Sequence, residues 1–121
     1  MNAIAVGAWL GFLGVALGAF GAHALRASLS GPQRDIYETA VVYHFMHALA
    51  LIAAGCVAWM RPAAEPLCRS AATCFALGVL LFSGSLYLLA VSGLRWLGAI
   101  TPLGGLLFLA GWACLAMAAR G

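Results

Sequence analysis

The first apolar segment of the chain reads AIAVGAWLGFLGVALGAFGAHAL, residues 3–25, and contains no Asp, Glu, Lys or Arg. A helix of about 20 residues crosses the ~30 Å hydrocarbon layer of a membrane, so this segment is long enough to span it. The composition of the chain agrees, because 65% of its 121 residues are hydrophobic, 7% are charged and the mean hydropathy is +1.05. A soluble domain carries about 25% charged residues. The sequence therefore predicts an integral membrane protein.

Three more apolar runs of similar length follow, and short segments that carry the charged residues separate them. None of the runs alternates between polar and apolar residues as a strand of a membrane β-barrel does. Short connections place consecutive helices antiparallel to one another. We predict an all-α integral membrane protein with four transmembrane helices in an up-down-up-down antiparallel bundle. It forms a single domain over residues 1–121, with helices at about 3–25, 32–60, 68–91 and 97–119.

Two connections carry signals for the start of a helix. Ser30 suits the N-cap position and Pro32 suits a first helical turn, so we expect the second helix to begin near Pro32, outside the lipid. The Thr101-Pro102 pair allows two interpretations. It either caps a helix that begins there or kinks a helix that begins at Leu97.

Glycines recur along residues 3–25 with spacings of four, three, four and three, which places them on one face of a helix. Helices in lipid associate through close backbone packing, which small residues permit. The stripe serves either packing within one chain or a surface for self-association or for a partner. We predict helix packing at Gly7, Gly11, Gly14, Gly18 and Gly21, and in the third and fourth runs at Gly78, Gly84, Gly104 and Gly111.

Four stretches of the chain together resemble a known family. They read GAFGAHAL (18–25), TAVVYHFMHALAL (39–51), LFSGSLYLLA (81–90) and ITPLGGLLFLAGW (100–112). They are similar to small bacterial inner-membrane proteins catalogued as domain of unknown function 423, a family with a small transmembrane relative in animals. The resemblance covers nearly the whole chain and implies a multi-pass protein of the bacterial inner (plasma) membrane. It implies no activity and no site residues.

Polar side chains inside the apolar runs are the candidate site, since such residues are costly in lipid and indicate either function or hydrogen-bonded packing. His44 and His47 are three residues apart and so share a helix face. The antiparallel topology places these candidate residues, the two histidines included, in the half of the membrane nearest the first and third connections. We predict a polar cluster that is either a hydrogen-bond network tying the helices together or a functional pocket. Its members are His23, Tyr43, His44, His47, Ser83, Ser85, Tyr87 and Thr101.

The other residue types give no indication of an enzyme. The three carboxylates lie in or near connections, and no nucleophile has a base at a recognisable spacing. The four cysteines have no CxxC spacing, and the six arginines are too scattered to bind nucleic acid. We expect no metal site and no cofactor; the alternative is haem or a metal ion on His23, His44 and His47.

We therefore expect a non-catalytic accessory or interaction component of a membrane complex or homo-oligomer. Its partners are the lipid bilayer and either itself or a larger membrane complex. The alternative is a small oligomeric transporter or channel that uses the histidine cluster, because histidine titrates near neutral pH. The arginines divide three against three between the two sides of the membrane, which leaves the positive-inside rule undecided. Asp35 and Glu38 lower the net charge beside the first connection, and this favours both termini in the cytoplasm.

Overall fold

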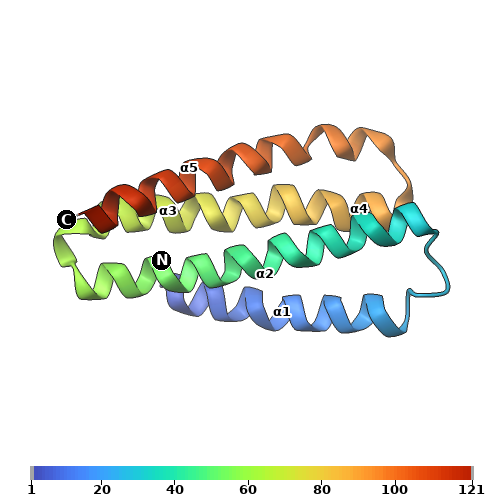
Figure 1. Ribbon diagram of the computed structural model, residues 1–121, viewed down its shortest axis with the longest axis horizontal. Coiled ribbons are helices and arrows are strands. Elements are labelled where there is room, and N and C mark those ends of the chain that lie inside the picture. Colours follow the sequence, from blue (N-terminus) through green and yellow to red (C-terminus); the bar gives the residue numbers. More distant parts are fainter. Residues whose placement is uncertain (1, 121) are drawn as a thin grey trace.

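The computed structural model describes residues 2–120, and it contains helices but no strand over that range. Four helical spans run antiparallel, joined by short connections (Figure 1). The third span consists of two α-helices separated by a π-helical turn. The elements are α1 (Ala3–His23), α2 (Gly31–Met60), η1 (Pro62–Ala64), α3 (Glu65–Gly78), η2 (Val79–Ser83), α4 (Gly84–Ser92), η3 (Arg95–Ala99) and α5 (Thr101–Arg120).

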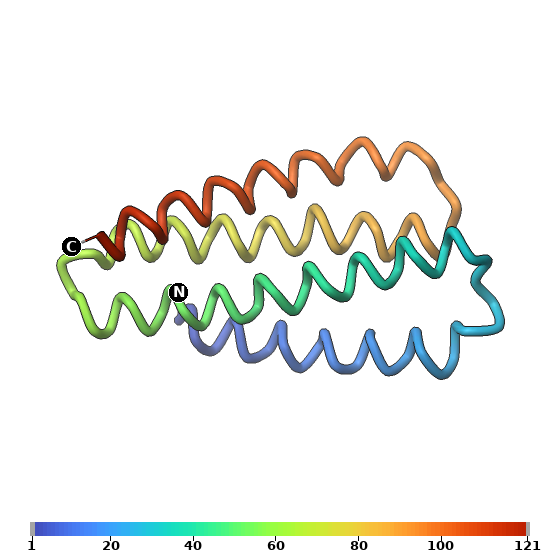
Figure 2. The backbone as a smooth tube through the Cα atoms, viewed as in Figure 1, coloured from blue at the N-terminus to red at the C-terminus, as the bar shows by residue number. Residues whose placement is uncertain are grey.

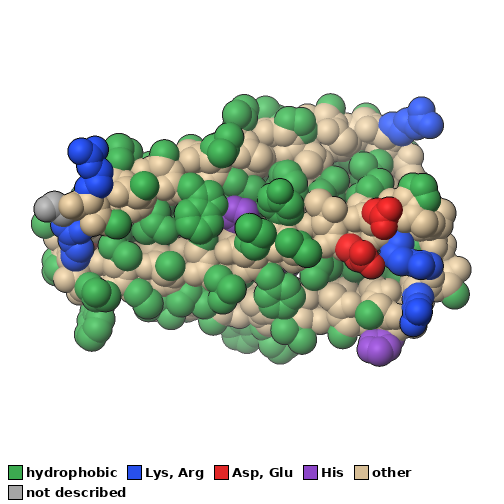
Figure 3. All heavy atoms as spheres, viewed as in Figure 1, with side chains coloured by type: hydrophobic (Ala, Val, Ile, Leu, Met, Phe, Trp, Pro, Cys, Tyr) green, Lys and Arg blue, Asp and Glu red, His purple; other side chains and the backbone are tan. Residues whose placement is uncertain are grey.

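Each of the four spans is long and apolar enough to cross a membrane. The charged side chains gather at the two ends of the molecule, and a hydrophobic band covers the middle of the face shown in Figure 3. Both chain ends lie at the same end of the molecule (Figure 1), as an even number of spans requires. The prediction of an all-α membrane protein with four antiparallel transmembrane helices is confirmed.

The helices form a row in which each packs mainly against its neighbour. α1 packs on α2, α2 packs on α3 and α4, and α3 packs on α5, whereas α1 touches α3 at few points (Figures 1 and 2). α1 and α5 are therefore the two edges of the row. Most of the core lies where α2, α3 and α5 meet, around the fully buried side chains of Leu51 and Phe75.

The start of α2 follows the expected capping pattern. The Ser30 Oγ accepts a hydrogen bond from the Gln33 backbone N–H (3.3 Å), and the Gln33 Oε1 accepts one from the Ser30 N–H (3.0 Å). Together these two bonds form a capping box, which satisfies backbone donors that the first helical turn leaves free. With Pro32 in that first turn, α2 begins at Gly31, and the expected start near Pro32 is confirmed.

The other helix boundaries differ from the expected ones by a few residues. α1 ends at His23 instead of 25, because the Leu25 N–H turns back to bond the Phe20 carbonyl (3.2 Å). The third span begins its α-helix at Glu65 instead of 68, since Pro66 and the acidic Glu65 both suit a first turn. The fourth begins its α-helix at Thr101 instead of 97, because residues 95–99 form a 3₁₀-helix. Of the two interpretations of Thr101-Pro102, the structure shows a helix that begins there.

The π-helical turn η2 is a feature that the sequence did not predict. In it the Gly84 N–H bonds the carbonyl of Val79, five residues earlier. The turn brings the backbone of Phe82 against α5 at Gly104. A Cβ added to Gly104 would overlap the Phe82 backbone nitrogen, so only glycine fits this contact. α4 then ends at Gly93, whose φ of 70° is the left-handed conformation common after the last turn of a helix.

The glycine stripe of α1 faces α2 within the same chain. A Cβ on Gly7 would lie 2.7 Å from the Ala48 carbonyl oxygen, which is too close for any other residue. Gly14, Gly18 and Gly21 lie over the α2 side chains of Phe45, Val41 and Tyr37, respectively. The glycines that contact α2 are Gly7, Gly14, Gly18 and Gly21.

Two of the predicted packing glycines contact no neighbouring helix. A Cβ on Gly11 would meet nothing within 4 Å, because the crossing of α1 and α2 leaves open space there. A Cβ on Gly84 would approach only the Val79 carbonyl of its own span, since the π-helical turn rotates this residue away from α5. Gly78 and Gly111, in contrast, each lie under an aromatic ring of the facing helix. Gly11 and Gly84 therefore do not contribute to helix packing within the chain.

Candidate functional site

The imidazole of His44 connects three helices. It is 3% exposed, and its Nε2 lies 2.7 Å from the Leu10 carbonyl oxygen of α1. Its Nδ1 lies 2.9 Å from the hydroxyl of Tyr87 on α4. A carbonyl only accepts, so Nε2 carries the hydrogen and donates it to Leu10. In the neutral ring Nδ1 is then an acceptor, and the Tyr87 hydroxyl donates to it.

The imidazole of His47 connects α2 with α5 and has the opposite tautomer. Its Nδ1 donates to the Tyr43 carbonyl of its own helix (2.7 Å), and its Nε2 accepts from the indole N–H of Trp112 (3.0 Å). The indole N–H can only donate, so both bonds require a hydrogen on Nδ1 and none on Nε2. The ring also stacks on Phe108, with ring centroids 3.5 Å apart and planes 7° from parallel.

Both histidines therefore have each ring nitrogen occupied by a partner from the same chain. A second proton on His47 would place its Nε2–H against the Trp112 N–H and would break that bond. Within residues 2–120 no buried side-chain nitrogen or oxygen lacks a hydrogen-bond partner. The arrangement is suited to joining helices, because neither ring holds a free lone pair.

Hydroxyl groups make two further connections between spans. The Ser83 Oγ, fully buried in the π-helical turn, donates to the Ala40 carbonyl of α2 (2.8 Å). The Ser85 Oγ lies 2.6 Å from the Thr101 Oγ1, which joins α4 to the first residue of α5. The structure thus brings six predicted residues into hydrogen bonds that link the four spans: His44, His47, Ser83, Ser85, Tyr87 and Thr101.

His23 is not part of this cluster. It is the last residue of α1 and is exposed, whereas Gly21, two residues earlier, faces Tyr37 of α2. Two residues turn an α-helix by about 200°, so the side chain of His23 points away from α2. The prediction for His23 was based on its position along the helix axis and not on the direction in which its side chain points around that axis.

Tyr43 joins the cluster through its ring and its backbone. Its side chain is 37% exposed, and its hydroxyl has no hydrogen bond within residues 2–120. The ring packs at 4.6 Å on that of Phe82, and the backbone carbonyl accepts from His47. The prediction of a polar role for the Tyr43 hydroxyl is therefore wrong.

The position of the histidine pair along α2 is the one expected for a helix that begins near Pro32. His44 and His47 are near the midpoint of α2, which runs from Gly31 to Met60, and the partner of His44 is Leu10 in the first half of α1. The serine and threonine contacts lie in the half nearest the first and third connections, as expected.

Three residues outside the predicted cluster also join the spans by hydrogen bonds. Trp112 donates to His47, and its position inside an apolar run, away from either end, is the available signal. The Tyr37 hydroxyl donates to the Leu17 carbonyl of α1, and its ring packs edge-on against Tyr87 at 5.2 Å. The Gln33 amide donates to the Ala90 carbonyl of α4 (3.0 Å), a role that the capping box conceals.

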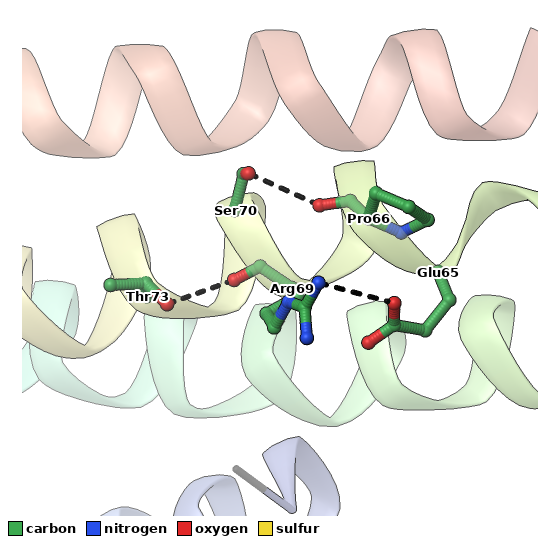
Figure 4. A network of polar contacts seen from close by, with 5 residues as sticks. All are labelled: Glu65, Pro66, Arg69, Ser70 and Thr73. Carbon is green, nitrogen blue, oxygen red and sulfur yellow. Dashed lines mark hydrogen bonds and ion pairs between the residues drawn. The ribbon is translucent and has the colours of Figure 1, made fainter.

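Polar side chains near the start of α3 behave differently (Figure 4). The Ser70 hydroxyl donates to the Pro66 carbonyl (3.1 Å) and that of Thr73 to the Arg69 carbonyl (2.9 Å), both within the same helix. Arg69 and Glu65 form an exposed ion pair of 3.7 Å one helical turn apart. These contacts join no helices; at this end of the molecule the bond between spans is that from the Arg61 guanidinium, at the end of α2, to the Ala119 carbonyl of α5 (2.7 Å).

The three histidines of the haem or metal alternative do not converge. His23 is exposed at the end of α1, whereas His44 and His47 are buried near the middle of α2. Over residues 2–120, no three His, Cys, Asp or Glu side chains lie close enough to hold a metal ion together.

A family model described as protein of unknown function (DUF423) matches residues 17–105 of this chain, which is more than half of it. The chain belongs to the DUF423 family. The match includes His44, His47 and the serine contacts of η2 and α4, whereas Leu10 and Trp112, which bond the two histidines, lie outside it.

Several bacterial members of the DUF423 family are similar over almost their whole length. A UPF0382 membrane protein of Staphylococcus haemolyticus is 45% identical over 112 residues, which cover 93% of this chain and 89% of that protein. The UPF0382 membrane protein YwdK of Bacillus subtilis is 40% identical over 116 residues (96% and 94%). The UPF0382 inner membrane protein YgdD of Escherichia coli is 41% identical over 109 residues (90% and 82%). No solved structure matches this DUF423 chain.

These relatives and the four apolar spans support a multi-pass protein of the inner membrane. The resemblance to a family of bacterial inner-membrane proteins is confirmed.

Proposed function

We propose that the protein is a non-catalytic accessory or interaction component, which assembles with itself or with a larger membrane complex, with both termini in the cytoplasm. The observation that carries this proposal is that every ring nitrogen of the two buried histidines already has a hydrogen-bond partner in the same chain. Each ring donates one hydrogen bond and accepts another within a single chain.

A transporter that used these histidines as a proton relay would need a lone pair that exchanges protons along a path. The lone pair of His47 accepts from Trp112, and that of His44 accepts from Tyr87. Each proton transfer would therefore break a bond that joins two spans. This supports a structural role for the pair over the alternative of a small oligomeric transporter or channel.

Fewer glycines are available for contact with a partner than the glycine spacing in the sequence suggested. Four of the five stripe glycines of α1 contact α2, and Gly78, Gly104 and Gly111 are covered within the same chain. Contacts with another protein must use outward faces, of which α1 and α5 offer the largest because they are the edges of the row.

The proposal is tested by reconstituting the purified protein in liposomes and measuring proton flux under an imposed pH gradient. We expect the same flux as in empty liposomes, with no change in the His44→Ala and His47→Ala variants. A flux that requires the protein and disappears in these variants would overturn the proposal in favour of the transporter.

The assembly is tested separately by extracting the protein from native membranes in polymer-bounded discs, without detergent, and determining the mass of the particles. We expect particles with more than one copy of the chain or with a stoichiometric second protein. Particles that hold a single copy alone would contradict the interaction role.

A further inference from the structure

A groove of about 530 Å³ lies between the end of α1 and the start of α2, beside the first connection. Three charged side chains line it: Arg26 of the connection, and Arg34 and Glu38 of α2. Charged side chains of both signs gather at this end of the molecule in Figure 3. The volume is in the range of small-molecule sites, which span about 300–1,000 Å³.

The charges in the groove are not paired with one another. Within residues 2–120 the one ion pair is that between Arg69 and Glu65, at the opposite end of the molecule. Arg34 donates to the backbone carbonyl of Arg26 (2.6 Å), which fixes the connection that carries Arg26. Both guanidinium groups and the Glu38 carboxylate therefore keep donor or acceptor capacity for a ligand.

The other residues that line the groove are mostly glycines and residues with apolar side chains. Gly18 and Gly21 of α1 line one side of it, the Tyr37 ring of α2 packs against Gly21, and Val41 and Val42 continue the α2 side along the helix axis. In a membrane-spanning chain this direction leads from the helix ends toward the hydrocarbon layer. The groove thus combines charged groups at the end of the helices with an apolar lining about one helical turn further along them.

A ligand that matches this groove carries a phosphate, an ammonium group a few bonds away and an acyl chain. We propose that the groove binds a phosphatidylethanolamine-type lipid, with its phosphate on Arg26 and Arg34, its ammonium on Glu38 and an acyl chain along Gly18 and Val41. Guanidinium groups form strong charge-assisted bonds with phosphate. An anionic lipid without an amine would leave the Glu38 carboxylate next to its phosphate. This inference does not depend on the proposed interaction role.

Native mass spectrometry of the detergent-purified protein tests the inference, with equimolar phosphatidylethanolamine, phosphatidylcholine and phosphatidylglycerol of identical acyl chains. We expect phosphatidylethanolamine to be retained most, because the methylated ammonium of phosphatidylcholine has no N–H to donate to Glu38. Soluble glycerophosphoethanolamine is added as a competitor and should displace little lipid, since it lacks the acyl chain. Displacement by this soluble headgroup would show that the groove binds a free phosphoamine and would overturn the lipid assignment.

Two variants test the proposed phosphate contact and the proposed ammonium contact separately. Arg26→Ala should lower retention of all three lipids by about fivefold or more, because it removes a phosphate partner. Glu38→Gln keeps the shape of the side chain and should abolish the preference for phosphatidylethanolamine over phosphatidylcholine while increasing retention of phosphatidylglycerol. Arg95→Ala, which changes an arginine of the third connection, serves as the matched control and should change nothing.

Equal retention of the three lipids by the unaltered protein would overturn the inference, and this result requires no variant to fold. Unchanged lipid preference in Glu38→Gln would overturn it as well. Size-exclusion elution and helical circular dichroism are recorded for each variant, so that only folded protein enters the comparison.

Discussion

At the scale of single residues, the main feature is a pair of buried histidines held in opposite tautomers. His44 carries its hydrogen on Nε2 because a carbonyl faces that atom, and His47 carries it on Nδ1 because Trp112 donates to its Nε2. Polar bonds between helices in lipid contribute roughly 0.6 kcal/mol each, so no single bond determines the fold. Together they define which faces of the spans meet.

Trp112→Phe tests the contribution of one of these bonds. The change removes the indole N–H and leaves the His47 Nε2 buried without a donor, while most of the ring volume remains. We expect the free energy of unfolding to fall by about 1 kcal/mol, measured by reversible unfolding in mixed micelles.

Trp96→Phe is the matched control, since Trp96 is exposed in the third connection. Its effect should be within about 0.5 kcal/mol of zero, as for most surface substitutions. An equal loss in the two variants would show that the Trp112–His47 bond contributes nothing specific.

At the scale of elements, the sequence predicted the features that depend on residues close together in the chain. The N-cap at Ser30 and the glycine stripe of α1 could be predicted from the sequence, because both depend on spacing along one helix. The residue that each glycine contacts could not be predicted, since that contact depends on how two helices cross. Gly11 follows the same spacing as Gly14, yet only Gly14 meets a ring of α2. The π-helical turn was also missed, because its register depends on the contact with α5 at Gly104.

Gly7→Ala and Gly11→Ala distinguish the two kinds of glycine in α1. The Cβ of Gly7→Ala would meet the Ala48 backbone oxygen at 2.7 Å, so α1 must move away from α2. We expect a loss of about 1–3 kcal/mol in the free energy of unfolding, as for other overpacked sites. Gly11→Ala enters open space and should have no cost. If both variants unfold alike, the packing of α1 on α2 differs from that described.

Gly104→Ala tests the contact between the π-helical turn and α5. The added methyl group would overlap the backbone of Phe82, which has no alternative rotamer to relieve it. We expect a loss of about 1–3 kcal/mol, measured in the same unfolding assay. The neighbouring Gly105→Ala is the control, because its Cβ would lie 3.9 Å from the Phe82 ring, an ordinary contact. Tolerance of Gly104→Ala would contradict the close approach of the turn.

At the scale of the whole molecule, apolar length alone was sufficient to predict four antiparallel spans. The arrangement of the spans in a row was not predictable in this way, because it requires knowing which helix faces meet. The same limit explains His23, which lies at the end of the first span as expected but on an exposed face of it. A row leaves α1 and α5 with broad outward faces, and these are the surfaces that an interaction component can offer.

The central claim is that the two buried histidines are neutral connectors between helices. Solid-state NMR of the ¹⁵N-histidine-labelled protein in bilayers at neutral pH measures this directly, with His23→Ala used to remove the exposed ring. We predict one ring protonated on Nε2 alone, assigned to His44, and one protonated on Nδ1 alone, assigned to His47, with no exchange of either proton with water. Two rings of the same tautomer, a ring protonated on both nitrogens, or exchange with water would contradict the account.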